Sequence, residues 1–292
     1  TEALDFRNAM RKVDLEYGES WFFQVWGPKS FERNGVGGRR EDWILRSGDR
    51  WHGFGKLAGN FNLLDPIKAT IVTPGLDING KFAVKGIPAA IVTKYLAEHG
   101  VVVEKTGLYS FFVMFTIGIT KGRWNTLVTE LQQFKADYDS NQPLWRVMPE
   151  FVQAHPEYER TGLQDLSTHI HEAYKRSDVA RVTTEMYLSD MVPAMKPSEA
   201  FQSLAHQRVD RVPIDDLVGR VTTMLVTPYP PGIPLLIPGE RFNATIVEYL
   251  KFVRSFNERF PGFATDVHGL LREVENGKAQ YFVDCVPLSD HD

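Results

Sequence analysis

The most constraining feature of this chain is an alternation, in its first half, between short apolar runs and segments with helical periodicity. Apolar residues at positions 124, 127, 128, 131 and 134 form one stripe on a helix that we expect over 121–138. Strand-length apolar runs precede it at 67–72 and 109–115, and a helix that begins at Pro88 and ends near His99 lies between them. Strands and helices mixed in this order predict a compact α+β domain.

The segment 139–162 has the composition of a junction between two domains. Pro143, Pro149, Pro156 and Gly162 interrupt any regular element there. We therefore predict one domain over residues 1–155 and a second over residues 156–292. In the second domain the pattern predicts helices over 163–177, from Pro197 onward and over 245–259, and strands over 221–226 and 281–286.

Composition restricts the class of protein. The chain has 292 residues, of which 43% are hydrophobic and 24% charged, the ordinary mix of a globular protein. A formal net charge of −4 argues against a general nucleic-acid binder. No run of about 18 apolar residues occurs, so we expect no membrane span. Cys285 is the single cysteine, which excludes an intrachain disulfide and predicts a reducing compartment, the cytoplasm.

The first residues predict another helix. Leu4, Met10 and Val13 recur at near-helical spacing, and the apolar run 21–26 that follows is typical of a strand. The chain opens without Met and without the apolar segment of a signal peptide. A chain that starts inside a helix is consistent with a fragment of a longer protein, and equally with a processed or tagged terminus.

Motifs that would define an active site by themselves are weak or missing. The stretch from Gly53 to Ala58 matches a loose G-x-G-x-x-A, but it lacks the strand and helix that a phosphate loop needs. His169 and His171 are two residues apart on a predicted helix, so we expect them on different faces. Neither a G-x-S-x-G elbow nor an H-E-x-x-H pair occurs. The residues alone offer no self-contained catalytic constellation.

Three segments stand out chemically, and each has a simpler structural interpretation. Trp51-His52-Gly53-Phe54 is typical of a loop anchored by aromatic rings. Glu104 comes directly after an apolar run, a position typical of a sheet edge, where clefts open. The simpler interpretation is a surface carboxylate paired with Lys105. Tyr229 lies in a proline-rich stretch over 228–238, which either presents its ring to a pocket or is a stiff structural loop.

Several short signatures occur in one order along the whole chain. They are Trp21-Phe22-Phe23-x-Val25-Trp26, Trp51-His52-Gly53-Phe54, Asp65-Pro66-Ile67-Lys68, Gly86-Ile87-Pro88-Ala89, Val103-Glu104-Lys105-Thr106-Gly107, the run 227–234, Pro238-Gly239-Glu240, Phe260-Pro261-Gly262-Phe263 and Asp266-x-His268-Gly269. Together they resemble the C-terminal portion of the bacterial ornithine/lysine/arginine decarboxylases, which use pyridoxal phosphate.

The resemblance implies an α+β fold. Residues 1–155 would be the end of the large domain and the small domain of a fold-type-I pyridoxal-phosphate enzyme, and residues 156–292 the C-terminal α+β domain of the family. In the family the cofactor lysine lies in a Ser-x-His-Lys sequence of the large domain, and no His-Lys pair occurs here. The resemblance therefore implies no catalytic residue in this chain, a cofactor bound mainly by the large domain, and an inactive chain on its own.

The resemblance also implies two substrate-binding residues. Glu104 matches a glutamate at the active-site entrance of lysine- and ornithine-type members, and Tyr229 matches a tyrosine that lines the same tunnel. No cofactor-binding residue and no metal ligand is assigned. The form Glu-Lys-Thr-Gly favours lysine, converted to cadaverine and CO2, over arginine, with ornithine third.

Partners and alternatives follow from the same resemblance. Family members form homodimers, in some cases decamers, and act on basic amino acids, so we expect neither nucleic acid nor membrane as a partner. Ala136 and Pro143 stand where some lysine-type members have arginines that bind a guanosine alarmone, and we do not predict that regulation. A function of a different class also stays open: the chain would be a non-catalytic assembly or inhibitor module of the same fold.

Overall fold

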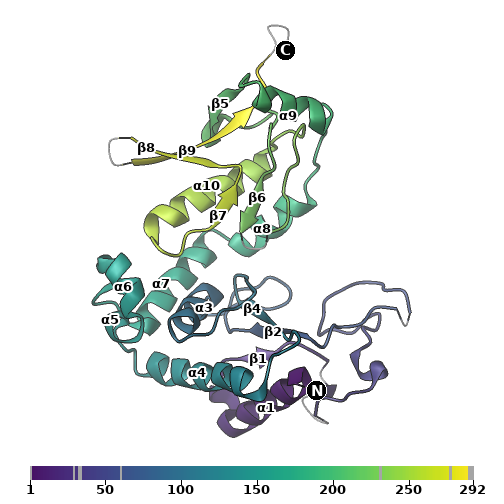
Figure 1. Ribbon diagram of the computed structural model, residues 1–292, viewed down its shortest axis with the longest axis vertical. Helices are drawn as coiled ribbons and strands as arrows, with labels where there is room; N and C mark the ends of the chain where they lie inside the picture. Colours follow the sequence, from purple (N-terminus) through teal and green to yellow (C-terminus); the bar gives the residue numbers. More distant parts are fainter. Residues whose placement is uncertain are drawn as a thin grey trace. The chain divides into compact units, whose positions relative to one another are not determined.

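The computed structural model describes residues 2–28, 30–31, 35–59, 61–229, 232–275 and 278–288 (Figure 1). Two compact units form the chain, Thr1–Glu172 and Ala173–Asp292. The division falls within helix α7 (Leu163–Arg176). The boundary expected between residues 155 and 156 lies earlier in the chain, and the domain assignment built on it stays a prediction.

The first unit is built on a four-stranded antiparallel sheet in the order β1-β2-β4-β3. Its strands are β1 (Gln24–Val25), β2 (Lys68–Val72), β3 (Lys105–Thr106) and β4 (Ser110–Met114). Along β2, Ala69 and Ile71 alternate with more exposed neighbours, the period of a strand with one buried face. Ile71 lies opposite Phe111 of β4, and both side chains are buried. The mixed order of strands and helices confirms the α+β prediction.

Three long helices complete the core of this unit. They are α1 (Glu2–Tyr17), α3 (Ala89–Glu98) and α4 (Lys121–Asp139), and α4 packs against both of the others (Figure 1). The predicted stripe on α4 is buried, with Leu131 and Phe134 inaccessible to solvent. Phe134 packs edge-on against Phe23, with ring centroids 5.7 Å apart. The helix predicted from Pro88 is α3, and Pro88 is its N-cap residue.

Short elements connect α4 to α7. They are α5 (Leu144–Val147), α6 (Pro149–Ala154) and the 3-10 turn η3 (Pro156–Tyr158); further 3-10 turns are η1 (Gly18–Ser20) and η2 (Arg40–Trp43). The carboxylate of Glu98, at the end of α3, accepts hydrogen bonds from the backbone N–H groups of Glu150 and Phe151 at the start of α6. Because a helix N-terminus leaves donors unpaired, this carboxylate caps α6 and fixes it to α3.

The second unit combines three helices with two small sheets (Figure 1). Its elements are α8 (Val179–Leu188), α9 (Pro197–Ala205), β5 (Asp210–Pro213), η4 (Ile214–Asp216), β6 (Thr227–Tyr229), α10 (Ala244–Arg259), β7 (Asp266–His268), β8 (Leu271–Glu275) and β9 (Lys278–Cys285). One sheet has the order β5-β9-β8, and β6 pairs with β7 in the other. Helix α10 packs against α8, and Leu250 and Val253 of α10 are fully buried in the core. Asn243 caps α10, because its side chain accepts a hydrogen bond from the N–H of Ile246.

Two local predictions are wrong. The expected strand 21–26 is reduced to the two residues of β1. The expected strand 221–226 makes only isolated bridges, at Val221, Thr222 and Val226. Its backbone bonds instead to several separate segments, with the N–H of Thr222 donating to Glu240 and that of Thr223 to Asp284. A β-branched run therefore lacks the single partner strand that a ladder requires.

Candidate functional site

Glu104 lies in the connection between α3 and β3. Gly100, with a φ of +79°, ends α3, and the N–H of Val101 donates back to the carbonyl of Leu96 at 2.8 Å. The chain then runs extended, and the N–H of Glu104 donates to the carbonyl of Phe112 in β4 at 3.0 Å. This pairing at the sheet edge leaves the Glu104 side chain exposed.

Glu104 lines a cavity of about 570 Å³ in the first unit. Val103, Val113, Met114, Phe115 and Leu127 supply apolar wall, and Arg123 lies in the same lining. Among the described residues, no ion pair joins Glu104 to Lys105. A carboxylate beside an apolar wall has the chemistry to bind a linear molecule that carries a cation at one end of a methylene chain.

Tyr229 is the last residue of β6 in the second unit. Its side chain is 45% exposed, and its ring lies 4.6 Å from the ring of His268, centroid to centroid. Pro230 and Pro231 of the proline-rich stretch lie outside the described residues. Tyr229 and Glu104 belong to different units, and each is described within its own unit. Both assignments as substrate-binding residues stay predictions.

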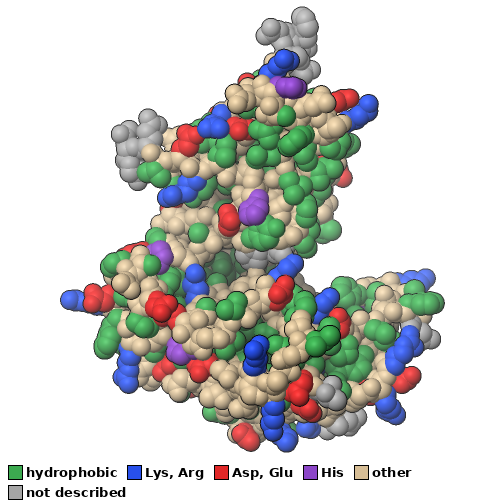
Figure 2. Space-filling model, in the orientation of Figure 1, with side chains coloured by type: hydrophobic (Ala, Val, Ile, Leu, Met, Phe, Trp, Pro, Cys, Tyr) green, Lys and Arg blue, Asp and Glu red, His purple; other side chains and the backbone are tan. Residues whose placement is uncertain are grey.

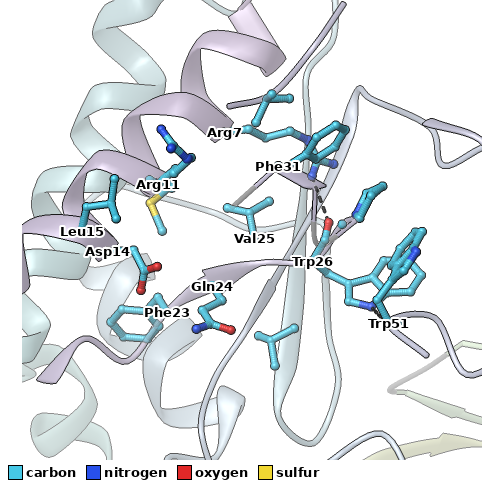
Figure 3. Close-up of a pocket in the computed structure, with 15 residues that line it drawn as sticks. Arg7, Arg11, Asp14, Leu15, Phe23, Gln24, Val25, Trp26, Phe31 and Trp51 are labelled. Atoms are coloured by element: carbon cyan, nitrogen blue, oxygen red, sulfur yellow. Dashed lines mark hydrogen bonds between the residues drawn. The ribbon is translucent and has the colours of Figure 1, made fainter. Parts of the chain in front are cut away.

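A cavity of about 390 Å³ between α1 and the β1 segment was not predicted (Figure 3). Arg7, Arg11 and Asp14 of α1 line it together with Trp26 and Trp51. In Figure 3 Arg11 and Asp14 lie on one side of the cavity and the two indoles on another. The cavity is thus lined by charged groups and aromatic rings.

Arg7 is the buried charge of this cavity, only 3% exposed. Its two terminal nitrogens donate to the backbone carbonyls of Trp26 and Lys68, each at 3.0 Å, and Figure 3 draws the first of these bonds. Burial lowers the pKa of the guanidinium to about 10, and the charge of Asp65 opposes that shift. Arg7 therefore ties α1 to β1 and β2. The helical pattern gave no signal for this, because arginines on amphipathic helices are mostly exposed.

A third cavity, of about 700 Å³, lies in the second unit beside the C-terminal end of α10. Asn257 of α10 fixes the loop that forms its rim, because its side chain exchanges two hydrogen bonds with the backbone of Thr265, at 3.0 and 2.9 Å. Asp266, Arg272 and Tyr281 also line this cavity. Nothing in the sequence pattern predicted it.

The segment around His52 is a loop anchored by aromatic rings, as the simpler interpretation expected. His52 is 4% exposed, its Nδ1 accepts from the N–H of Phe54, and its Nε2 donates to the carbonyl of Arg46 at 3.0 Å. Trp51 packs on Trp26, with centroids 4.9 Å apart. No helix follows within 53–58, so this stretch has no phosphate-loop geometry.

The histidines of α7 point to different faces, as predicted: His169 is exposed and His171 is 1% exposed. Within the described ranges, no group of three or more His, Cys, Asp or Glu side chains could hold a metal ion. None of the helices in the described part of the chain combines the length and the hydropathy that crossing a membrane requires. On the face shown in Figure 2, acidic and basic side chains are interspersed rather than gathered into one basic area.

Two family models match the chain in the order that the signatures predict. "Orn/Lys/Arg decarboxylase, major domain" matches residues 1–123, and "Orn/Lys/Arg decarboxylase, C-terminal domain" matches residues 180–287. The chain belongs to the Orn/Lys/Arg decarboxylase family. The predicted family and its α+β fold are therefore confirmed.

Individual members of this family align over nearly the whole chain. Lysine decarboxylase LdcA of Pseudomonas aeruginosa is 47% identical over 98% of this chain and 38% of its own length. The biodegradative arginine decarboxylase of Escherichia coli is 36% identical over 98% of this chain and 40% of its length. An inducible ornithine decarboxylase of Escherichia coli is 32% identical over 84% of this chain and 34% of its length. The chain thus spans about two fifths of the length of the lysine and arginine decarboxylases named here.

Solved structures give the same result. Lysine decarboxylase A from Pseudomonas aeruginosa superposes with a TM-score of 0.91 at 46% identity, covering 98% of this chain and 39% of that one. The constitutive lysine decarboxylase of Escherichia coli has a TM-score of 0.88 at 35% identity, with the same coverage. The fold of this chain is therefore the fold of the corresponding part of lysine decarboxylases.

Proposed function

We propose that this chain acts as the C-terminal portion of a pyridoxal-phosphate-dependent amino-acid decarboxylase whose preferred substrate is lysine, with cadaverine and CO2 as products. The observation that carries the proposal is the 47% identity to a lysine decarboxylase over 98% of the chain. Identity to the arginine and ornithine decarboxylases is lower, at 36% and 32%. Arginine, which would give agmatine, is the second candidate substrate and ornithine the third.

Glu104 is the residue of this chain that we assign to the distal ammonium group of the substrate. Glu104 lines a cavity with apolar walls, and a carboxylate in such a setting suits a cation on a chain of methylene groups. Removing the negative charge while keeping the size of the side chain should weaken binding. A charge-assisted hydrogen bond contributes about 1.5–3 kcal/mol when it is shielded from solvent. Because the Glu104 side chain is exposed, we expect an effect at the lower end of this range. Tyr229 is assigned separately, as apolar wall for the substrate's methylene groups.

Pyridoxal phosphate would supply the electron sink for loss of CO2, but the cavities of this chain do not fit it. Its aldehyde requires a lysine amine, and no lysine lines any of the three cavities described above. Among the described residues, the glycine-rich stretch 35–38 beside the first cavity leads into the 3-10 turn η2, and it offers no α-helix start for the phosphate. We therefore assign cofactor binding to a part of the polypeptide outside this chain, and we expect the 292-residue chain alone to be inactive.

The setting of the enzyme belongs to the same proposal. We expect it to act in the cytoplasm as a homodimer, with assembly to a decamer as a further state. The single, buried cysteine suits a reducing compartment. The alternative from another class, a non-catalytic assembly or inhibitor module, predicts that lysine has no effect on the protein and that Glu104 can be replaced without consequence.

The experiment uses the longest natural polypeptide that contains this chain, loaded with pyridoxal phosphate. Lysine, arginine and ornithine are compared by kcat/KM. Glu104→Gln should lower kcat/KM for lysine by roughly tenfold, which corresponds to about 1.4 kcal/mol. Glu159→Gln is the matched control, because Glu159 is an exposed carboxylate of the same unit that lines none of the three cavities. An equal kcat/KM in wild type and Glu104→Gln would remove Glu104 from the substrate site.

A further inference from the structure

The ring of Tyr229 is constrained although the side chain is 45% exposed. It belongs to the two-stranded sheet in which Tyr229 of β6 lies opposite Asp266 of β7 and Thr227 opposite His268. Tyr229 and His268 are therefore diagonal neighbours on the same face of the sheet. Their ring centroids are 4.6 Å apart with 39° between the ring planes, a direct contact of two aromatic rings.

Gly232 bounds the tyrosine ring from a second direction. A Cβ atom at position 232 would lie 2.8 Å from Cε1 and 3.2 Å from Cδ1 of Tyr229. The same glycine has a φ of +75°, and its N–H donates to the carbonyl of Pro228 at 2.7 Å. Only a residue without a side chain allows the backbone to approach the ring this closely. The tyrosine ring is thus held between the backbone at 232 and the imidazole of His268.

The backbone of His268 is constrained, although its side chain is 62% exposed. Its Nε2 lies 3.5 Å from a carboxylate oxygen of Asp266, two residues earlier on the same strand. The following residue, Gly269, has a φ of +91°, and a Cβ there would lie 2.5 Å from the carbonyl oxygen of Leu225. The chain therefore turns immediately after His268, against the segment that leads into β6. This turn leaves the His268 backbone little freedom.

We propose that His268 is a positioning residue that sets the ring of Tyr229 for substrate binding. The inference rests on the proposed function, in which Tyr229 contacts the methylene groups of a linear basic amino acid. A half-exposed tyrosine without a neighbour samples several rotamers, and binding must then immobilise it at a cost in affinity. Contact with the imidazole restricts the tyrosine ring before substrate binds, so binding loses less affinity. No assignment made above gives His268 a role.

The predicted signature is a change in KM without a matching change in kcat. His268 contacts Tyr229 rather than any reacting atom, so its loss weakens the binding of substrate and transition state equally. Immobilising one such side chain corresponds to roughly a threefold to tenfold change in affinity. A role in chemistry would lower kcat instead.

The test measures KM and kcat for lysine in the longest natural polypeptide that contains this chain, loaded with pyridoxal phosphate. His268→Ala should raise KM by about threefold to tenfold and leave kcat within about twofold of wild type. His268→Phe keeps a ring at this position and should restore a KM close to that of wild type. His268→Gln, which has no ring, should behave like His268→Ala and replaces it if the alanine variant does not fold.

The outcomes separate the two claims. Absence of lysine, arginine and ornithine turnover in the wild type would overturn the proposed function, and this inference with it. Turnover in the wild type with an unchanged KM in His268→Ala and His268→Gln would overturn the inference alone. A KM that stays raised in His268→Phe would also overturn it, because ring contact with Tyr229 would then not be the cause.

Discussion

The hydroxyl group of Tyr109 lies 2.6 Å from Nδ1 of His171, and both side chains are buried. On the other side of the imidazole, Nε2 lies 3.1 Å from the carbonyl oxygen of Ala83. A carbonyl oxygen only accepts, so Nε2 carries the hydrogen and Nδ1 accepts from the tyrosine hydroxyl. One histidine on α7 thereby joins the start of β4 to the loop that contains Ala83. This contact lies inside the first unit and fixes the first part of α7 to the sheet.

Replacing Tyr109 by Phe should destabilise the first unit. The change removes only the hydroxyl and leaves the buried Nδ1 of His171 without a donor, which costs about 1–3 kcal/mol. Thermal or urea unfolding measures the loss. Tyr17→Phe, at a tyrosine that is 38% exposed, should change the free energy of unfolding by less than about 0.5 kcal/mol. Equal effects of the two substitutions would contradict the importance of this hydrogen bond.

The same site predicts that Gly86 tolerates no side chain. A Cβ atom there would lie 2.3 Å from Nδ1 of His171 and 2.8 Å from the Cα of Gly75. Gly86→Ala should therefore destabilise the protein by about 1–3 kcal/mol through overpacking. Gly55→Ala is the control, because a Cβ at Gly55 meets nothing within 4 Å. Unfolding midpoints that fall equally in both variants would rule out the close approach as the cause.

Arg7→Lys tests the buried guanidinium of α1. The two hydrogen bonds that Arg7 donates diverge to the carbonyls of Trp26 and Lys68, and a single ammonium group cannot replace this fork. We expect a loss of about 1–3 kcal/mol in the free energy of unfolding. Arg146→Lys, at an exposed arginine of the same unit, should be nearly neutral. A neutral Arg7→Lys would show that the fork does not hold α1 to the sheet.

Cys285 should be unreactive in the native protein. It is fully buried, and burial raises the pKa of its thiol from an ordinary 9.0 to about 12. Because the thiolate is the reactive form, a thiol reagent at pH 8 should label the denatured chain and leave the folded chain unlabelled. Rapid labelling under native conditions would contradict the burial of Cys285.

The same pKa shift predicts a loss of stability at alkaline pH. Below about pH 9 the thiol is protonated in both states and contributes no pH dependence. Between pH 9 and pH 12 the unfolded state loses the proton first, so stability falls as pH rises, by up to about 1.4 kcal/mol per pH unit. The difference in the free energy of unfolding between wild type and Cys285→Ala isolates this contribution, because buried tyrosines act in the same direction in both proteins. A difference that does not vary over this range would contradict the shift.

The helices and strands that could be predicted are those whose buried side chains recur at a regular spacing within one segment of the sequence. The stripe of α4 includes Leu131 and Phe134, which are both fully buried, and β2 and α10 lie close to their expected bounds. The strand expected over 221–226 is wrong because its backbone partners come from segments far apart in the sequence. The side chain of Thr223 even donates to the carbonyl of Asp284. Such partners leave no local periodicity.

For the candidate site, the sequence likewise predicted individual residues but not the contacts between them. The signatures contained Glu104, Tyr229 and His268, but spacing alone could not pair Tyr229 with His268. That contact depends on the pairing of β6 with β7, which lie on either side of α10 in the sequence. The role of Arg7 was missed for a related reason, because its partners are backbone carbonyls, which carry no sequence signal.

The most direct test of the account is the specificity constant of the longest natural polypeptide that contains this chain. Purified with pyridoxal phosphate, it is assayed for release of CO2 from lysine, arginine and ornithine, beside the 292-residue chain alone. We expect the highest kcat/KM for lysine and no turnover by the shorter chain. A higher kcat/KM for arginine or ornithine, or decarboxylation of lysine by the 292-residue chain alone, would contradict it.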